Sequence, residues 1–145
     1  MLVGTRHTGI VVSDIELSLE FFIGIGYRVV SREVESGLTV SKIVGIPEVR
    51  IDIAKLRAPD ESMIELLQYL SHPDLGESYS QPSNKLGCSH IALSVKSIDH
   101  VSRKIVELGG SLVDEPVLSV NGAVLVCYCH SPFGVLMELV EEVQN

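Results

Sequence analysis

Two histidines and two glutamates occupy matching positions in the two halves of the chain. His7 and His90 each open a run of strand-forming residues, HTGIVV and HIALSV, whereas Glu65 and Glu138 each interrupt an apolar run. A carboxylate on the buried face of a strand is costly unless a cation or a donor pairs with it. Two imidazoles and two carboxylates suit one divalent ion such as Ni, Co, Mn, Zn or Fe. We therefore predict that these four residues hold one divalent metal ion.

An internal repeat supports this grouping. An offset of 83 residues aligns His7 with His90, and an offset of 73 residues aligns Glu65 with Glu138. A lone histidine or glutamate on a strand is more often a structural residue than a metal ligand. The repeat changes this judgement, because it places one His/Glu pair at equivalent positions in each half.

Each half is predicted to fold as a βαβββ module. A helix should begin at 13–14 in the first half and at 96–99 in the second, where a small polar side chain can cap free backbone N–H groups. Further strands are expected at 27–35, 49–56, 111–113 and 123–129, and at the apolar runs that contain the two glutamates. Residues 37–47 are expected to form a loop that includes one helical turn.

These modules define the predicted organisation of the chain. Residues 1–70 form the first module and residues 88–145 form the second. The segment 71–87, rich in turn formers, links them within one structural domain. The predicted fold class is α+β, with a cupped mixed sheet around the metal site.

Composition limits the partners and the location. The 145 residues are 46% hydrophobic and carry a formal charge of −8, which disfavours nucleic acid as a partner. No apolar run is long enough to span a bilayer, and the N-terminus is a poor signal peptide, so we expect no membrane partner and a cytoplasmic protein. The odd count of three cysteines fits a reducing compartment, with Cys127 and Cys129 as buried thiols on one face of a strand.

The sequence resembles the vicinal oxygen chelate superfamily, which includes glyoxalase I, methylmalonyl-CoA epimerase, extradiol dioxygenases and bleomycin-resistance proteins. The resemblance covers roughly residues 5–142. It rests on the paired modules, the two strand-opening histidines and three segments, which are Ile64-Glu-Leu-Leu67, Gly87-Cys-Ser-His90-Ile-Ala and His130-Ser-Pro-Phe-Gly-Val-Leu-Met-Glu138-Leu.

The resemblance implies a metal-dependent lyase or isomerase that acts on a small carbonyl or acyl-thioester substrate through a metal-stabilised enediolate. The family's metal ligands fall on the same four residues, and Glu138 or Glu65 would act as the catalytic base. Glu65 is a fourth ligand where dioxygenases usually have three, and this favours the non-redox branch. Both glyoxalase-like and epimerase-like activities stay open, because Thr8–Val12 contains no basic residue for glutathione and residues 34–52 depart from the epimerase pattern.

Two other functions stay open from the sequence, namely a ring-cleaving extradiol dioxygenase and a non-catalytic small-molecule binding protein of the antibiotic-resistance type. Additional residues could act near the site, and these are Asp52, Glu48, Glu115, Tyr128 and His130. The open sheet edges of each module lead us to expect a homodimer, with the metal cup built from either one chain or two.

Overall fold

The computed structural model describes residues 1–76, 82–84, 86–87 and 90–143. The chain divides into two compact units, Met1–Gly76 and Glu77–Asn145. The predicted linker 71–87 crosses this boundary, and part of it lies outside the described residues. Cys88 also lies outside the described residues. Among the described residues, no helix is both long and apolar enough to cross a membrane.

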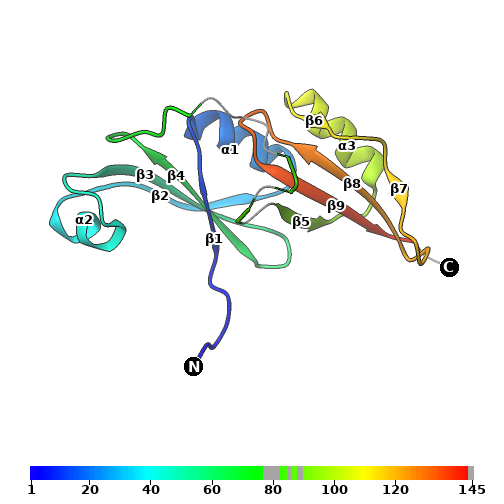
Figure 1. Cartoon of the computed structure of the whole chain (residues 1–145), viewed down its shortest axis with the longest axis horizontal. Helices are drawn as coiled ribbons and strands as arrows, with labels where there is room; N and C mark the ends of the chain where they lie inside the picture. Colours follow the sequence, from blue (N-terminus) through cyan, green and yellow to red (C-terminus); the bar gives the residue numbers. More distant parts are fainter. Residues whose placement is uncertain (77–81, 85, 88–89, 144–145) are drawn as a thin grey trace. The chain divides into compact units, whose positions relative to one another are not determined.

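The first unit contains a four-stranded mixed sheet with the order β1-β4-β3-β2 (Figure 1). Strand β1 (Thr8–Val11) runs parallel to β4 (Met63–Tyr69). Strand β3 (Arg50–Arg57) is antiparallel to both β4 and β2 (Arg28–Ser36). The parallel pair joins the first and last strands of the module, so the residue that opens β1 lies beside β4.

Helix α1 (Ile15–Gly24) covers one face of this sheet. It begins where predicted, because the Asp14 side chain accepts a 3.0 Å hydrogen bond from the Leu17 N–H. The two phenylalanines of α1, Phe21 and Phe22, are each only 1% exposed. Burial of such large apolar side chains is the main force that holds the helix on the sheet.

Helix α2 (Leu38–Val44) is longer than the single helical turn predicted within this loop. It is seven residues long and lies between β2 and β3 (Figure 1), bounded by Gly37 and Gly45 with φ values of 97° and 74°. Val40 packs into a buried cluster with Val49, Ile51 and Ile53. The partly buried Val44 of the same helix also packs against this cluster. Tertiary packing of these two valines, which the sequence pattern did not single out, stabilises the short helix.

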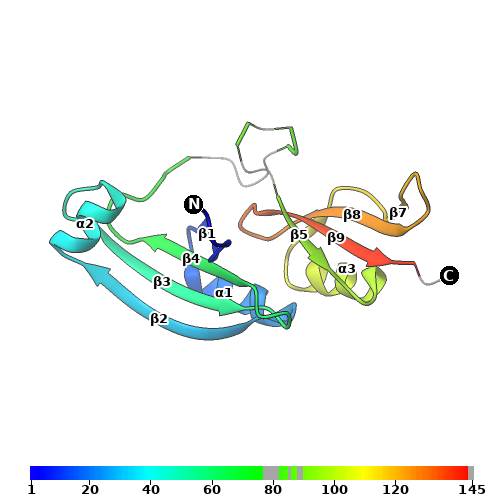
Figure 2. The same ribbon diagram turned by 90° about the horizontal axis from the view of Figure 1, so that it is seen from below.

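The second unit repeats the plan with a five-stranded sheet (Figure 2). Strand β5 (Ile91–Ser94) is parallel to β9 (Leu136–Glu142), which is antiparallel to β8 (Val124–His130). Two short strands, β6 (Ser111–Leu112) and β7 (Val117–Leu118), both pair with β8. The order is therefore β5-β9-β8-β6, with β7 also on β8.

Strand β7 was not predicted. Together, β6 and β7 take the place that the single strand β2 has in the first unit. The chain between them contains Pro116, which has no N–H to donate to a strand partner, and this explains the interruption.

Helix α3 (Ile98–Glu107) packs against β8 and β9, on one face of the second sheet (Figure 2). Its N-cap is Ser97, as predicted, whose hydroxyl accepts a 3.3 Å hydrogen bond from the His100 N–H. Both units thus have the βαβββ plan, with one strand split in the second unit. The predicted α+β class is confirmed, in the form of two mixed sheets with few helices.

Candidate metal centre

The two faces of the first sheet have different roles. Ala54, Leu56 and Leu66 are fully buried on the face that α1 covers. Strand side chains alternate, so Glu65 lies on the opposite face, together with Lys55, its partner in the β3–β4 register. Ile51 and Ile53 share that second face, and α2 packs against them. Among the described residues of this unit, neither helix packs against the part of this face that carries Glu65.

Within the first unit, His7 and Glu65 form a contact pair. The distance from His7 Nε2 to Glu65 Oε2 is 3.3 Å, and the two side chains are 33% and 14% exposed. Gly9 is the residue of β1 that pairs in register with Glu65. A Cβ at Gly9 would lie 3.3 Å from Leu67 Cδ1, so the glycine preserves room beside the carboxylate.

Within the second unit, His90 and Glu138 form the equivalent pair. The distance from His90 Nε2 to Glu138 Oε2 is 3.1 Å, with the side chains 29% and 23% exposed. Another small residue, Ala92, pairs in register with Glu138 on β5. Tyr128 pairs in register with Glu138 on β8, and its ring meets the His90 ring edge to face, with centroids 5.1 Å apart. This contact restricts the orientation of the imidazole.

The distances within the pairs fit two ligands of one metal ion. Divalent metals bind histidine nitrogen and carboxylate oxygen at about 2.1 Å. Two such ligands are therefore about 3.0 Å apart at a 90° angle and about 3.4 Å apart at a tetrahedral angle. The observed 3.3 Å and 3.1 Å fall inside this range. The donor set of each pair, one imidazole and one carboxylate, also suits a borderline divalent cation.

The structure thus brings the predicted ligands together two by two, each pair inside its own unit. Among the residues that the structure describes, no three histidine, cysteine or acidic side chains cluster closely enough to form a metal site. That all four residues share one ion stays a prediction.

Of the additional candidates, Tyr128 contacts His90, and His130 lies two residues further along β8 on the same face as Tyr128. Asp52 and Glu48 lie away from the pair in their unit. Asp52 is on the α1 face, where Arg32 binds its two oxygens at 3.1 Å and 2.8 Å. Arg32 also contacts Glu16 at 2.7 Å, and these two carboxylates raise the pKa of the guanidinium further above its usual range. Glu48 is an exposed residue with a φ of 53° in the connection from α2 to β3. The contacts of Asp52 with Arg32 indicate a structural role for this carboxylate.

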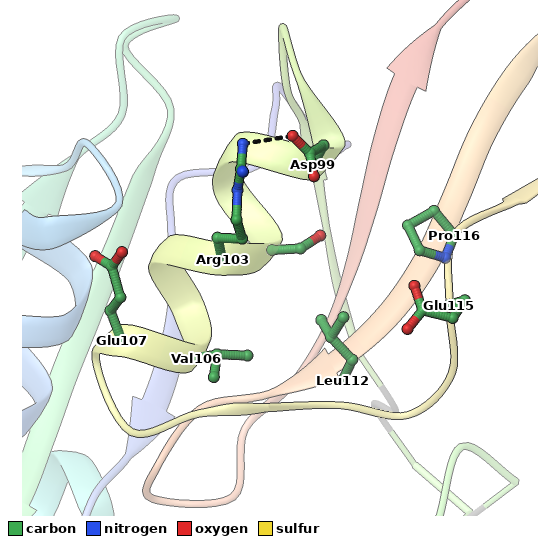
Figure 3. Close-up of a pocket in the computed structure, with 8 residues that line it drawn as sticks. Asp99, Arg103, Val106, Glu107, Leu112, Glu115 and Pro116 are labelled. Atoms are coloured by element: carbon green, nitrogen blue, oxygen red, sulfur yellow. Dashed lines mark hydrogen bonds and ion pairs between the residues drawn. The ribbon is translucent and has the colours of Figure 1, made fainter.

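Glu115 lines a cavity of about 450 Å³ in the second unit (Figure 3). The cavity lies between α3 and the segment around Leu112, and the Asp99–Arg103 ion pair borders it. Ser102 also lines it, and this residue belongs to the α3 face of the sheet. The cavity is therefore on the opposite face from Glu138 and is separate from the candidate metal centre.

The sequence interpretation missed one polar residue beside the pairs. Lys55 Nζ lies 3.8 Å from Glu65 Oε1, and the Lys55 side chain is 39% exposed. The offset of 73 residues that aligns Glu65 with Glu138 also aligns Lys55 with Tyr128. This alignment could have revealed Lys55 from the sequence, because Tyr128 was already a candidate residue near the site.

Cys127 and Cys129 are free, buried thiols on β8, as predicted. Burial raises the pKa of both thiols, and that of Cys129 reaches about 12. They are consequently protonated at neutral pH, and a thiol rather than a thiolate is a poor nucleophile and metal ligand. These cysteines are part of the core and take no part in the candidate centre.

Comparison with known proteins agrees with the fold and the paired modules. The sequence profile of the Glyoxalase/Bleomycin resistance protein/Dioxygenase superfamily matches residues 6–128. The chain therefore belongs to this superfamily. No match is found among curated proteins.

Solved structures show the same fold. A glyoxalase family protein from Bacillus cereus is 28% identical, with a TM-score of 0.91 over 99% of this chain and 97% of that one. A glyoxylase/bleomycin resistance protein/dioxygenase domain from Frankia is 16% identical, with a TM-score of 0.70 over 100% and 96%. A mutant of the fosfomycin resistance protein FosX from Listeria monocytogenes, in complex with Mn(II) and 1S,2S-dihydroxypropylphosphonic acid, is 18% identical, with a TM-score of 0.65 over 96% of this chain and 90% of that one.

Proposed function

We propose that this chain is a metal-dependent lyase or isomerase that acts on a small carbonyl or acyl-thioester substrate through an enediolate. One observation carries the proposal: each unit holds a histidine and a glutamate at 3.3 Å or 3.1 Å, at equivalent positions of the repeat. A repeat also duplicates structural residues, but a polar pair is costly on the inner part of a sheet unless it has a partner. Two ligands of a metal ion in each half would explain why both halves keep this pair.

In this proposal His7, Glu65, His90 and Glu138 together hold one divalent ion, with Ni, Co, Mn, Zn and Fe as the candidate metals. When bound, the cation would act as a Lewis acid toward two adjacent oxygens of the substrate. Superfamily members typically use a divalent metal, and the solved FosX complex contains Mn(II).

The residues of this chain would then have distinct tasks. His7 and His90 would bind as neutral imidazoles through Nε2, the atom that faces each carboxylate. Glu65 or Glu138 would take the proton next to the substrate carbonyl and return it on the other carbon or the other face. Both carboxylates are largely shielded from water, at 14% and 23% exposed, which strengthens their interaction with a developing charge.

Exchange of hydrogen at carbon tests the reaction class. Metal-reconstituted protein in D₂O should exchange the α-proton of the correct substrate, and methylglyoxal–thiol adducts and 2-substituted acyl thioesters are the first to try. NMR of the substrate measures this exchange. Glu65→Gln and Glu138→Gln should reduce the exchange rate by at least 100-fold, the usual contribution of general base catalysis, whereas Glu115→Gln should not. Oxygen uptake coupled to turnover would instead identify a dioxygenase, and metal-free binding without turnover would identify a binding protein.

The assembly we propose is a homodimer in the cytoplasm. A twofold dimer is the commonest oligomer, and the exposed edges of small sheets favour pairing. The metal cup can then be built from one chain or from two. A 17-residue linker at 71–87 has a typical reach of about 20–25 Å if it is flexible, so we favour the one-chain cup.

Mixing two inactive variants, His7→Ala and His90→Ala, under subunit exchange distinguishes the two arrangements. In a cup built from one chain, every site keeps a defect, and we expect the mixture to stay inactive. In a cup built from two chains, each mixed dimer contains one intact site, so activity recovered in proportion to mixed dimer would contradict our choice.

A further inference from the structure

Lys55 occupies an unusual position for a cation. It is the cross-strand neighbour of Glu65, and its ammonium nitrogen lies 3.8 Å from one carboxylate oxygen. The other oxygen of Glu65 faces His7. If Glu65 binds a divalent cation, as proposed above, a fixed positive charge this close opposes binding of the metal. Pairing with the Glu65 carboxylate therefore does not by itself explain why a lysine lies at position 55.

Pairing with Glu65 is a weak reason. The 3.8 Å separation exceeds the 2.7–2.9 Å typical of a charge-assisted hydrogen bond. The lysine side chain is 39% exposed, and ion pairs that open to solvent contribute little to stability. The second unit shows that the sheet has no need of a cation here, because Tyr128 occupies the equivalent register position beside Glu138.

The charge of the proposed centre supplies a stronger reason. A divalent ion with two carboxylates and two neutral imidazoles has no net charge, so Lys55 leaves the centre with one excess positive charge. An anionic group on the substrate would neutralise it. The same face of β3 also carries Arg57, two residues further along, but its guanidinium is paired with Glu61 at 2.7 Å, so the excess charge beside the centre is that of Lys55.

We propose that Lys55 binds an anionic oxo group of the substrate, such as a carboxylate, phosphate or phosphonate, and thereby selects small acids. The proposal rests on the function proposed above. Since the ammonium lies within a few ångströms of Glu65, the anionic group must be on or next to the carbons that react. A charge at the far end of a large thioester would not reach it.

Binding of methylphosphonate and of its uncharged diester, dimethyl methylphosphonate, tests this role without turnover. Calorimetry would first measure Mn(II) binding to each variant and then binding of each probe to the Mn(II)-loaded protein. Lys55→Met should weaken methylphosphonate binding by about tenfold or more, the factor that corresponds to about 1.4 kcal/mol. It should leave diester binding unchanged and keep or increase Mn(II) affinity, because a competing cation is removed. Lys55→Arg should retain anion binding within about threefold.

Lys104→Met is the matched control. Its side chain is 41% exposed and is paired with Glu107 at 3.3 Å, so it resembles Lys55 in exposure and pairing but lies on α3. Mn(II) affinity at least equal to that of the wild type shows that each variant is folded, and Lys55→Gln provides a polar replacement if the Met variant does not fold. Mn(II) binding with equal anion affinity in wild type and in the Met or Gln variant would overturn this inference alone. Wild-type protein that binds none of the candidate metals would overturn the proposed function and this inference with it.

Discussion

Removal of one histidine from each pair shows whether the two pairs share an ion. The variants are His7→Ala, His90→Ala and the double variant, with His100→Ala, an exposed residue of α3, as the control. If one ion is shared, wild-type protein binds a single equivalent per chain. Each single variant then loses affinity for that same ion, and the stoichiometry does not rise above one.

The magnitude follows from the geometry of the pairs. Both histidines present Nε2 to a carboxylate oxygen at a separation that fits two ligands of one ion. Residues that only support a ligand typically change metal affinity by 10–100-fold. Loss of a ligand itself should therefore cost at least tenfold, or about 1.4 kcal/mol. Substitution of the partner carboxylate, for example Glu138→Ala, should cost at least as much, because it removes a charge as well as a donor.

Titration calorimetry of metal-stripped protein with Ni, Co, Mn and Zn provides the measurement, and elemental analysis of the purified protein provides the stoichiometry. Two separate ions would give two equivalents per chain, and each single variant would lose one of them and leave the other unchanged. That result would refute the shared centre even though metal binds. Absence of any signal with all four metals would refute the metal proposal itself.

Two further predictions concern stability. Arg32→Met should lower the free energy of unfolding by about 2–3 kcal/mol, because it leaves Asp52 buried without its bidentate partner. Urea denaturation measures this change. The control is Arg103→Met, which breaks an exposed ion pair and should change the free energy of unfolding by less than about 0.5 kcal/mol. Cys129 releases its proton more easily in the unfolded chain, so stability should fall by up to about 1.4 kcal/mol per pH unit between pH 9 and 12. Cys129→Val should reduce this slope, and an equal slope in both proteins would contradict the assignment.

The two His/Glu pairs were predictable because three independent patterns agree on them. Strand alternation puts Glu65 on the face away from the apolar residues that α1 buries, the repeat relates it to Glu138, and both histidines open a strand parallel to the glutamate strand. Parallel pairing of the first and last strands brings His7 and Glu65 together across 58 positions of sequence. The periodicity of the strands and the internal repeat are both visible in the sequence, and such patterns predict local structure well.

The features that were missed depend on packing rather than on pattern. Helix α2 forms because Val40 completes a cluster with residues from β3. A seven-residue helix is too short to show a recognisable hydrophobic periodicity in the sequence. Strand β7 is two residues long and exists only because β8 offers it a partner. The role of Asp52 likewise depends on the reach of Arg32, which a linear reading of the chain cannot supply.

Lys55 and Tyr128 occupy equivalent positions of the repeat but differ in residue type. Positions where both halves keep the same residue type, such as the histidines and glutamates, indicate a chemistry that both halves share. Positions where the halves differ beside those residues indicate what breaks the symmetry. A symmetric centre has no means to distinguish the two ends of a substrate, whereas a lysine beside one glutamate and a tyrosine beside the other provide one. In this chain, therefore, the differences between equivalent positions next to the proposed ligands are where substrate selection should be sought first.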